Sequence, residues 1–290
     1  MNTGCVELTS DELRIQLETM VDKMPAFPQS VQRILQLTAD LNCPHKELVQ
    51  IIEHDPVITV KILKLLNSAY YNLPHKITSI KRSVVYIGFN TIKNLALSIA
   101  SVGMLPKKNG AGFDSGQFLL HSLSTAAIAK KLGGRINEPE IDKTDCFVGG
   151  LIHDFGKIVF AQYKPDKFSQ SLQKSKAEQI SLHEAELEII GADHGTVGSI
   201  LGEKWQFTPS LIECIGAHHD DDGLNNGMRD CVVAANQVSK KLALGHSGHN
   251  VIDELPGAVS DRFGMGLDDL IDSLGDIEAE REEIKAYAYM

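Results

Sequence analysis

Apolar residues recur every three or four positions along most of this chain, and this spacing restricts the fold more than any other feature. The clearest runs are Val31, Ile34, Leu35, Thr38 and Leu41, then Leu48, Ile51 and Ile52, then Val60, Leu63 and Leu66. Such spacing places apolar side chains on one face of an α-helix, whereas a half-buried strand needs alternating apolar and polar residues. No sustained alternation flanked by turn dipeptides occurs, so we predict an all-α fold.

Capping residues mark the start of several of these helices. Three starts are visible: Asp55 before Pro56, Ser79 at the head of a run that ends at Gly88, and Ser181 with Glu184 three residues later. A short polar side chain accepts a hydrogen bond from the first free backbone N–H groups of a helix, and proline fits the first helical position. We also expect a helix rather than a strand over residues 157–163, although Ile, Val and Phe occur there.

The charge balance and the cysteines restrict the functional classes. The 290 residues carry a formal net charge of −10 and show no basic run, which argues against a general nucleic-acid surface. The five cysteines are odd in number, widely spaced and without a Cys-x-x-Cys pair, which indicates reduced thiols. Residues 1–16 lack the apolar core of a signal peptide, and no apolar run approaches a membrane span. We therefore expect a cytoplasmic protein without membrane association.

A segment rich in glycine, proline and lysine, residues 105–116, divides the chain. Such residues favour loops, so we predict a helical N-terminal unit over residues 1–105 and a second unit over residues 106–290. The acidic stretch that begins at Asp268 carries apolar residues at helical spacing, namely Leu270, Ile271, Leu274 and Ile277. This pattern predicts an amphipathic helix that packs on the body or on a partner.

Histidines gather in the second unit around the adjacent residues His153 and Asp154. His121 precedes this pair, and three histidines follow it, at His194, His218 and His219. Imidazole nitrogens and carboxylate oxygens delivered from separate helices are common ligands of divalent transition metals. The ordered set predicts a metal site. The simpler alternatives are a hydrogen-bonded His153–Asp154 pair at a helix junction and a solvated loop at residues 218–219.

Other polar and aromatic residues have simpler interpretations. Asn67 is expected to end a front helix through hydrogen bonds, and Trp205 is expected to pack in the core. The remaining histidines match no ligand position and are interpreted as surface or core residues: His45, His54, His75, His183, His246 and His249.

Three segments resemble the HDOD family, the HD-related output domains of bacterial signalling proteins. Residues 55–95, which read DPVITVKILKLLNSAYYNLPHKITSIKRSVVYIGFNTIKNL, are similar to the N-terminal half of the family's domain. Two later segments are similar to the C-terminal half of that domain: residues 149–160, GGLIHDFGKIVF, and residues 191–219, GADHGTVGSILGEKWQFTPSLIECIGAHH. The resemblance implies an HD-type helical bundle joined to a helical N-terminal subdomain. It implies no activity, because many members of the family have lost the metal ligands.

Compared with catalytic HD and HD-GYP phosphohydrolases, the chain retains the ligand types of their metal site. The resemblance implies that Asp154 bridges two ions, and that the remaining ligands form two sets, His121, His153 and Asn236 on one side and His194, His218 and His219 on the other. Asn236 stands where those enzymes carry an aspartate, and its neutral oxygen holds a cation less strongly. Lys157 matches the lysine of the HDxGK form, in which a cation neutralises a substrate phosphate. Asp154 and Lys157 are therefore the candidate catalytic residues.

Two functions follow from the resemblance. The first is a bacterial-type signalling or regulatory protein with a His/Asp metal site and a signalling protein as its partner. The alternative is a metal-dependent phosphohydrolase that acts on an unassigned phosphoester or nucleotide. The Gly-Tyr-Pro signature of the cyclic-dinucleotide phosphodiesterases is missing, which counts against that substrate. In either case one or two ions of iron, manganese or zinc suit a histidine-rich site better than magnesium or calcium. The oligomeric state stays open.

Overall fold

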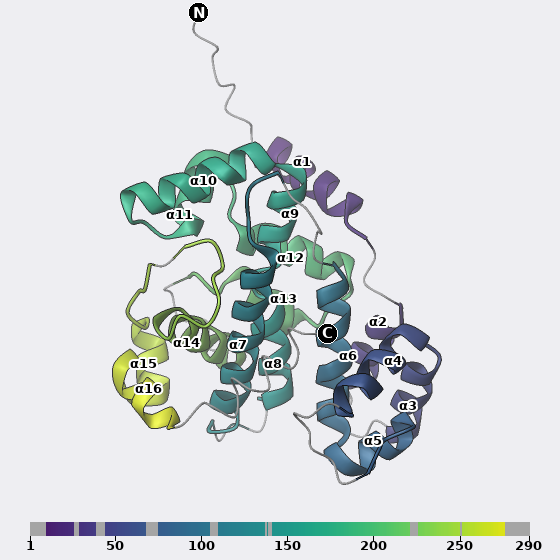
Figure 1. Cartoon of the computed structure of the whole chain (residues 1–290). Coiled ribbons are helices and arrows are strands. Elements are labelled where there is room, and N and C mark those ends of the chain that lie inside the picture. The colour runs from purple at the N-terminus through teal and green to yellow at the C-terminus, as the bar shows by residue number, and fades with distance from the viewer. Residues whose placement is uncertain are drawn as a thin grey trace, which may run out of the picture.

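The chain folds into α-helices throughout the parts that the structure describes (Figure 1). This computed structural model describes residues 10–25, 29–38, 44–67, 75–104, 110–136, 138, 141–220, 226–249 and 251–275. Every regular element in these ranges is helical, so the predicted all-α fold is confirmed. The helix expected directly after His153 and Asp154 is present as α9 (Gly156–Tyr163).

The front part of the chain is a compact group of helices that pack on one another. They are α2 (Gln29–Thr38), α3 (His45–Glu53), α4 (Pro56–Leu66), α5 (Ile80–Ile87) and α6 (Phe89–Met104). Asp55 caps α4 by accepting from the N–H groups of Val57 and Ile58, and Ser79 caps α5, as the sequence predicts. Asn67 ends α4 and bonds to both the N–H and the carbonyl of Ile77, which confirms its structural role.

The buried face of α4 agrees with the predicted one at Leu66 and in part at Leu63, but not at Val60. Val60 is 63% exposed, whereas Ile58, Ile62, Leu65 and Leu66 are buried. The physical reason is that α4 is apolar around most of its circumference, so its spacing fits more than one stripe and only the neighbouring helices select the face. Leu41 of the preceding run lies outside the described residues.

The back part is a larger bundle whose central element is α7. Its helices are α7 (Ser115–Gly133), α8 (Lys143–Ile152), α9, α10 (Pro165–Glu178), α11 (Leu182–Ile190), α12 (His194–Lys204), α13 (Pro209–Gly216), α14 (Gly227–Lys241), α15 (Gly257–Phe263) and α16 (Leu267–Leu274). Helix α7 is buried around most of its surface and packs on α8 and α14 (Figure 1). Close packing depends on small residues: a Cβ on Gly150 would lie 2.8 Å from the backbone of Ala126.

The first helix, α1 (Ser10–Lys23), lies against α9 and α12 of the bundle. Lys204 donates to the carbonyl of Val21, and the Tyr163 hydroxyl donates to that of Lys23. The division of the chain near residue 105 stays a prediction. The predicted N-terminal unit, residues 1–105, includes α1, which packs on the second unit.

The acidic tail begins with the predicted amphipathic helix, α16, which packs on α14. Leu270 and Leu274 are buried there and Ile271 is partly buried, whereas Ile277 lies outside the described residues. Within the part of the chain that the structure describes, no helix combines the length and the apolarity needed to cross a bilayer. The described cysteines, Cys146, Cys214 and Cys231, are free and buried.

Candidate metal centre

Most of the predicted ligands come from helix ends, which meet the interior of α7 at one point of the bundle. His121 lies on α7, while His153 and Asp154 form the turn between α8 and α9. His194 is the first residue of α12, and His218 and His219 follow the end of α13. Helix ends suit this role because their side chains are not confined to the lateral face of a helix.

Glycines allow these helix ends to approach. A Cβ on Gly156, the first residue of α9, would overlap the backbone carbonyl oxygen of His194. One on Gly195 would lie 2.9 Å from the carbonyl oxygen of Gly216, and one on Gly198 would lie 2.8 Å from Ile215. The close helix approach expected around His194 is therefore present.

Asp154 lies at the centre of the cluster, and its two carboxylate oxygens face different histidines. Its Oδ2 is 3.4 Å from His153 Nε2 and 3.7 Å from His121 Nε2. Its Oδ1 is 3.1 Å from His194 Nε2 and 3.7 Å from His218 Nε2.

His219 completes the second of two groups that share Asp154. Its Nε2 is 2.8 Å from that of His194. The groups are His121, His153 and Asp154, and Asp154, His194, His218 and His219; within each, ligand atoms lie within 4.8 Å of one another. This is the division into two histidine sets that the family resemblance implies. The solvated loop considered for residues 218–219 is excluded, because His218 is buried and His219 is half-buried.

Three of the histidines are held through Nδ1, which leaves Nε2 directed at Asp154. His153 Nδ1 is 2.9 Å from the carbonyl oxygen of Gly150, and His218 Nδ1 is 2.6 Å from that of Ile215. His194 Nδ1 is 2.5 Å from the carboxylate of Glu186, which also accepts from the His194 backbone N–H at 2.8 Å. Each acceptor keeps a proton on Nδ1. The Nε2 lone pair is therefore available in neutral His153 and His218, and in His194 once its ring gives up the second proton. Metal-binding histidines in proteins are typically oriented in this way.

Buried atoms without partners test whether these residues suit a metal ion. His153 Nε2, His218 Nε2 and Asp154 Oδ1 are buried and have no hydrogen-bond partner among the described residues. Buried polar atoms normally have partners, and these three belong to neighbouring side chains of one cluster. A set of imidazole nitrogens around a carboxylate is a suitable ligand set for a divalent transition metal, so the residues fit such an ion.

Burial keeps most of these imidazoles neutral. It lowers the pKa of His121 to about 3 and that of His218 below its ordinary value. It also holds the pKa values of His153 and His219 well below their usual range. Desolvation disfavours the charged form, and a neutral imidazole is the form that binds a metal.

Asp154 and His194 carry the charges of the cluster. Burial by itself raises the pKa of Asp154, but His153 and the Lys157 ammonium outweigh this effect and hold it well below its usual range. Burial by itself lowers the pKa of His194, but the carboxylates of Glu186 and Asp154 together outweigh it and raise that pKa to about 8. The centre therefore contains an ionised carboxylate.

Lys157 is buried beside Asp154 and forms an ion pair with it. Its ammonium donates to Asp154 Oδ2 at 2.8 Å and to the Ser247 hydroxyl at 3.3 Å. Lys157 thus lies on the Oδ2 side of the Asp154 carboxylate. His121 and His153 lie on the same side. The centre is closed: all of these side chains are at most 3% exposed except that of His219.

Asn236 lies on α14 with its side chain 4% exposed, and its Oδ1 has no hydrogen-bond partner among the described residues. On the same helix, Ser239 accepts a hydrogen bond from Thr125, whose hydroxyl is 3.5 Å from His121 Nε2. The role of Asn236 as a ligand stays a prediction. Trp205 packs edge-on against Phe155, in agreement with the expected core position.

Sequence reasoning missed two residues that contact the cluster. Glu186 is fully buried, and His183, interpreted as an ordinary surface or core residue, stacks on His219 with 4.3 Å between ring centroids. Both belong to α11, which the Ser181 capping box begins. A signal for Glu186 was present, because it is a charged residue next to Ala185 on the apolar stripe of this helix.

A scan of the sequence against protein-family models matches the HDOD domain over residues 24–221. Among curated proteins, an uncharacterised protein of Treponema pallidum (strain Nichols) is 20% identical over 215 residues. The match covers 74% of this chain but 41% of the relative, so the chain corresponds to about two fifths of that protein.

Solved structures share the fold. An HDOD domain protein of unknown function from Geobacter sulfurreducens is 25% identical, with a TM-score of 0.79 and coverage of 95% of this chain and 96% of the other. A protein of Marinobacter aquaeolei VT8, provisionally named a signal transduction protein, is 20% identical with a TM-score of 0.78, over 96% and 65% of the two chains. One from Shewanella amazonensis SB2B, provisionally named a phosphohydrolase, is 22% identical with a TM-score of 0.72, over 94% and 97%.

Proposed function

This chain belongs to the HDOD family, and we propose that it is a signalling or regulatory protein whose His/Asp cluster binds one or two divalent transition-metal ions. Iron, manganese and zinc suit the ligand types. The proposed metal ligands are Asp154, His121, His153, His194, His218, His219 and Asn236. As part of the same proposal the protein acts in the cytoplasm on a signalling partner, which agrees with the free buried thiols of the described core.

One observation carries the proposal. His153, His194 and His218 each have Nδ1 held by an acceptor and Nε2 within 3.7 Å of the same carboxylate, that of Asp154. A cluster retained only for packing has no need of three imidazoles that are each held through Nδ1 and face a common carboxylate. The arrangement instead matches the outer hydrogen bonds that orient metal ligands.

The two oxygens of Asp154 are not equivalent toward a cation. Lys157 donates to Oδ2, so an ion on that side meets a lasting positive charge, whereas Oδ1 faces His194 and His218, and the His194 ring can release its extra proton when an ion binds. Like charges in a buried site repel strongly. We therefore assign the tighter site to Oδ1, His194, His218 and His219, and the weaker one to the Oδ2 side.

Metal content of the purified, untagged protein tests the proposal. We expect one or two equivalents of iron, manganese or zinc by elemental mass spectrometry, and less than a tenth of this in Asp154→Asn. Asparagine keeps the shape and still accepts from Lys157, so the helical fold should persist in circular dichroism. Asp261→Asn, which removes an exposed carboxylate on α15, is the matched control and should retain the metal. Substoichiometric metal in the parent after reconstitution would refute metal binding.

A metal-dependent phosphohydrolase is the second candidate, and the buried Lys157 next to Asp154 favours it. Bound ions would supply Lewis acidity, and the Lys157 ammonium would balance the charge of a phosphoester. The closure of the centre argues for the regulatory role, since its side chains are almost fully buried. The two are separated by assaying the metal-loaded protein on bis(p-nitrophenyl) phosphate: turnover that Asp154→Asn abolishes would establish the enzyme, and absence of turnover would favour the regulatory protein.

A further inference from the structure

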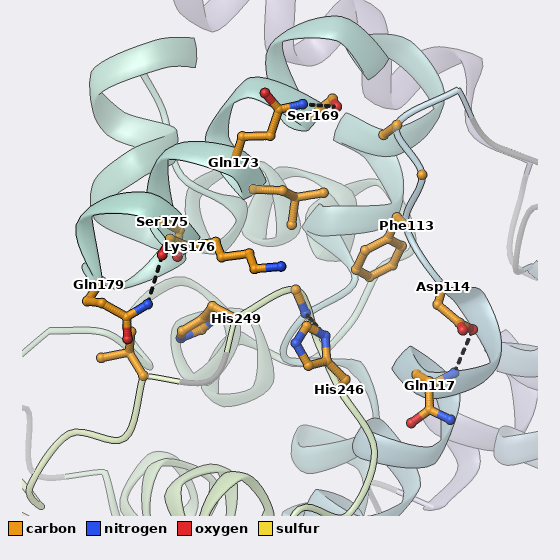
Figure 2. A pocket seen from close by; sticks show the side chains of 15 residues that line it. Phe113, Asp114, Gln117, Ser169, Gln173, Ser175, Lys176, Gln179, His246 and His249 are labelled. Carbon is orange, nitrogen blue, oxygen red and sulfur yellow. Dashed lines mark hydrogen bonds between the residues drawn. The ribbon is translucent and has the colours of Figure 1, made fainter.

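A cavity of about 690 Å³ lies between α10, the beginning of α7 and the segment of residues 245–249 that follows α14, with Val251 also in its lining (Figure 2). Its volume falls within the range of roughly 300–1,000 Å³ that small-molecule sites occupy. None of the proposed metal ligands lines it. It is therefore a separate feature from the metal centre.

His249 lines this cavity, and its ring has a buried hydrogen-bond donor without a partner among the described residues. The Lys240 ammonium lies 3.0 Å from His249 Nε2, and because an ammonium can only donate, Nε2 is the acceptor. Burial, together with the nearby lysine charges, holds the pKa of His249 well below its usual range, so the neutral ring carries its proton on Nδ1. That Nδ1 is buried and has no hydrogen-bond partner among the described residues. An unmatched buried donor is rare and here lies in the wall of a cavity.

His246 and Lys176 add two more donors. The backbone N–H of Gly248 donates to His246 Nδ1 at 3.1 Å, which places the proton of the neutral ring on Nε2. Figure 2 shows the Lys176 side chain extending into the cavity above both histidines. The carboxylate among the lining residues, that of Asp114, already caps α7 by accepting from the N–H groups of Gly116 and Gln117. The donors that have no partner among the described residues, those of His246, His249 and Lys176, therefore favour a ligand that carries a hydrogen-bond acceptor.

The lining also contains apolar side chains, those of Phe113, Leu172 and Val251. We propose that the cavity binds a small organic anion, with a phosphate or carboxylate group at His246, His249 and Lys176 and an apolar body against these three side chains. Neutral imidazole donors together with one ammonium suit an oxyanion that is hydrogen-bonded on several sides.

The same segment connects the cavity to the metal centre. Ser247, between the two cavity histidines, accepts a hydrogen bond from Lys157, which also donates to Asp154. The backbone N–H of His246 donates to the Gln117 carbonyl at 3.1 Å, so the segment lies directly on α7, the helix that carries His121. An anion bound at His246 and His249 thus lies on the other side of this segment from the Lys157–Asp154 pair.

Calorimetric titration with phenyl phosphate and with phenylacetate tests the proposal. The full chain is used after treatment with a chelator, so that an anion bound to a metal ion does not contribute. We expect saturable binding of at least one probe, and which of them binds more tightly identifies phosphate or carboxylate as the preferred group. Phenol, which has the ring without the oxyanion, should not bind measurably.

Two variants and one control locate the binding. His249→Gln retains an acceptor for Lys240 and removes the Nδ1 donor, and should weaken binding about tenfold. Lys176→Gln, at an exposed position, should weaken it about threefold. Lys167→Gln removes the same charge from α10 outside the cavity and should leave the affinity unchanged. Absence of saturable binding of both probes, or parental affinity in both cavity variants, would overturn the proposal, whatever metal the protein holds.

Discussion

Replacement of Glu186 by glutamine should weaken metal binding without disturbing the fold. The Glu186 carboxylate receives both the backbone N–H and the Nδ1 of His194, and it is fully buried. A neutral amide oxygen can still accept from His194, so the shape of the site is retained. The negative charge, which makes the His194 ring more basic, is lost.

The structure sets the size of this effect. His194 has a pKa of about 8 against an ordinary value of 6.5, although burial works in the opposite direction. The difference corresponds to roughly 2 kcal/mol of net stabilisation of the charged ring, to which Glu186 and Asp154 contribute against burial and Lys157. Loss of a carboxylate behind a metal-bound histidine typically costs about 10- to 100-fold in metal affinity. We expect a loss within this range in Glu186→Gln.

The assay is competitive zinc titration of the metal-free protein against a chromogenic chelator. Glu188→Gln is the matched control, because it makes the same change on the same helix at an exposed residue that pairs with Lys174. NMR of the ring nitrogens should also show the pKa of His194 falling below its value in the parent. If Glu186→Gln folds and binds zinc as tightly as parent and control, then Glu186 does not support a metal ligand, and the assignment of His194 loses its main support.

Three further predictions concern packing, charge and pH. Gly156→Ala should destabilise the protein by about 2 kcal/mol or more in urea unfolding, because its Cβ has no room, whereas Gly257→Ala, with open space around it, should have little effect. Lys157→Gln should tighten the weaker metal site about tenfold in zinc titration, because a cation beside Asp154 is removed; unchanged affinity would contradict the assignment of that site to the Oδ2 side. The pKa of His121 is about 3 in the folded protein and 6.5 ordinarily, so the unfolded chain binds more protons between these values. The metal-free protein should therefore keep this stability above pH 6.5 and lose it as the pH falls toward 3, and urea unfolding that is constant from pH 7 to 4 would contradict this.

The family and the main candidate residues could be recognised from the sequence because each has a local signal. The pair His153–Asp154 is contiguous, and the capping residues Asp55 and Ser79 act within four residues of their own position. The stripe predicted for α4 was wrong at Val60, although Leu66 is buried and Leu63 is partly buried, for a related reason. Where a helix is apolar on most sides, its local pattern does not specify which face is buried, and the helices packed around it decide.

The roles of three residues could not be predicted from local sequence patterns, namely Glu186, His183 and Lys240. Each contacts a partner on another segment: His194, His219 and His249 respectively. These contacts depend on the angle and separation of α11, α12 and the segment after α14, and no spacing in the sequence encodes such distances.

The sequence by itself determined the helical class, several helix starts, the family and the types of ligand available, because periodicity, capping and motif composition all act over a few residues. Only the tertiary structure decided that two histidine groups share the two oxygens of Asp154, that Lys157 lies on one side of it, and that a cavity with unmatched donors adjoins the centre. The physical reason is that tautomers, burial and charge balance are set by atoms brought together from distant segments, and these meet only when the helices pack.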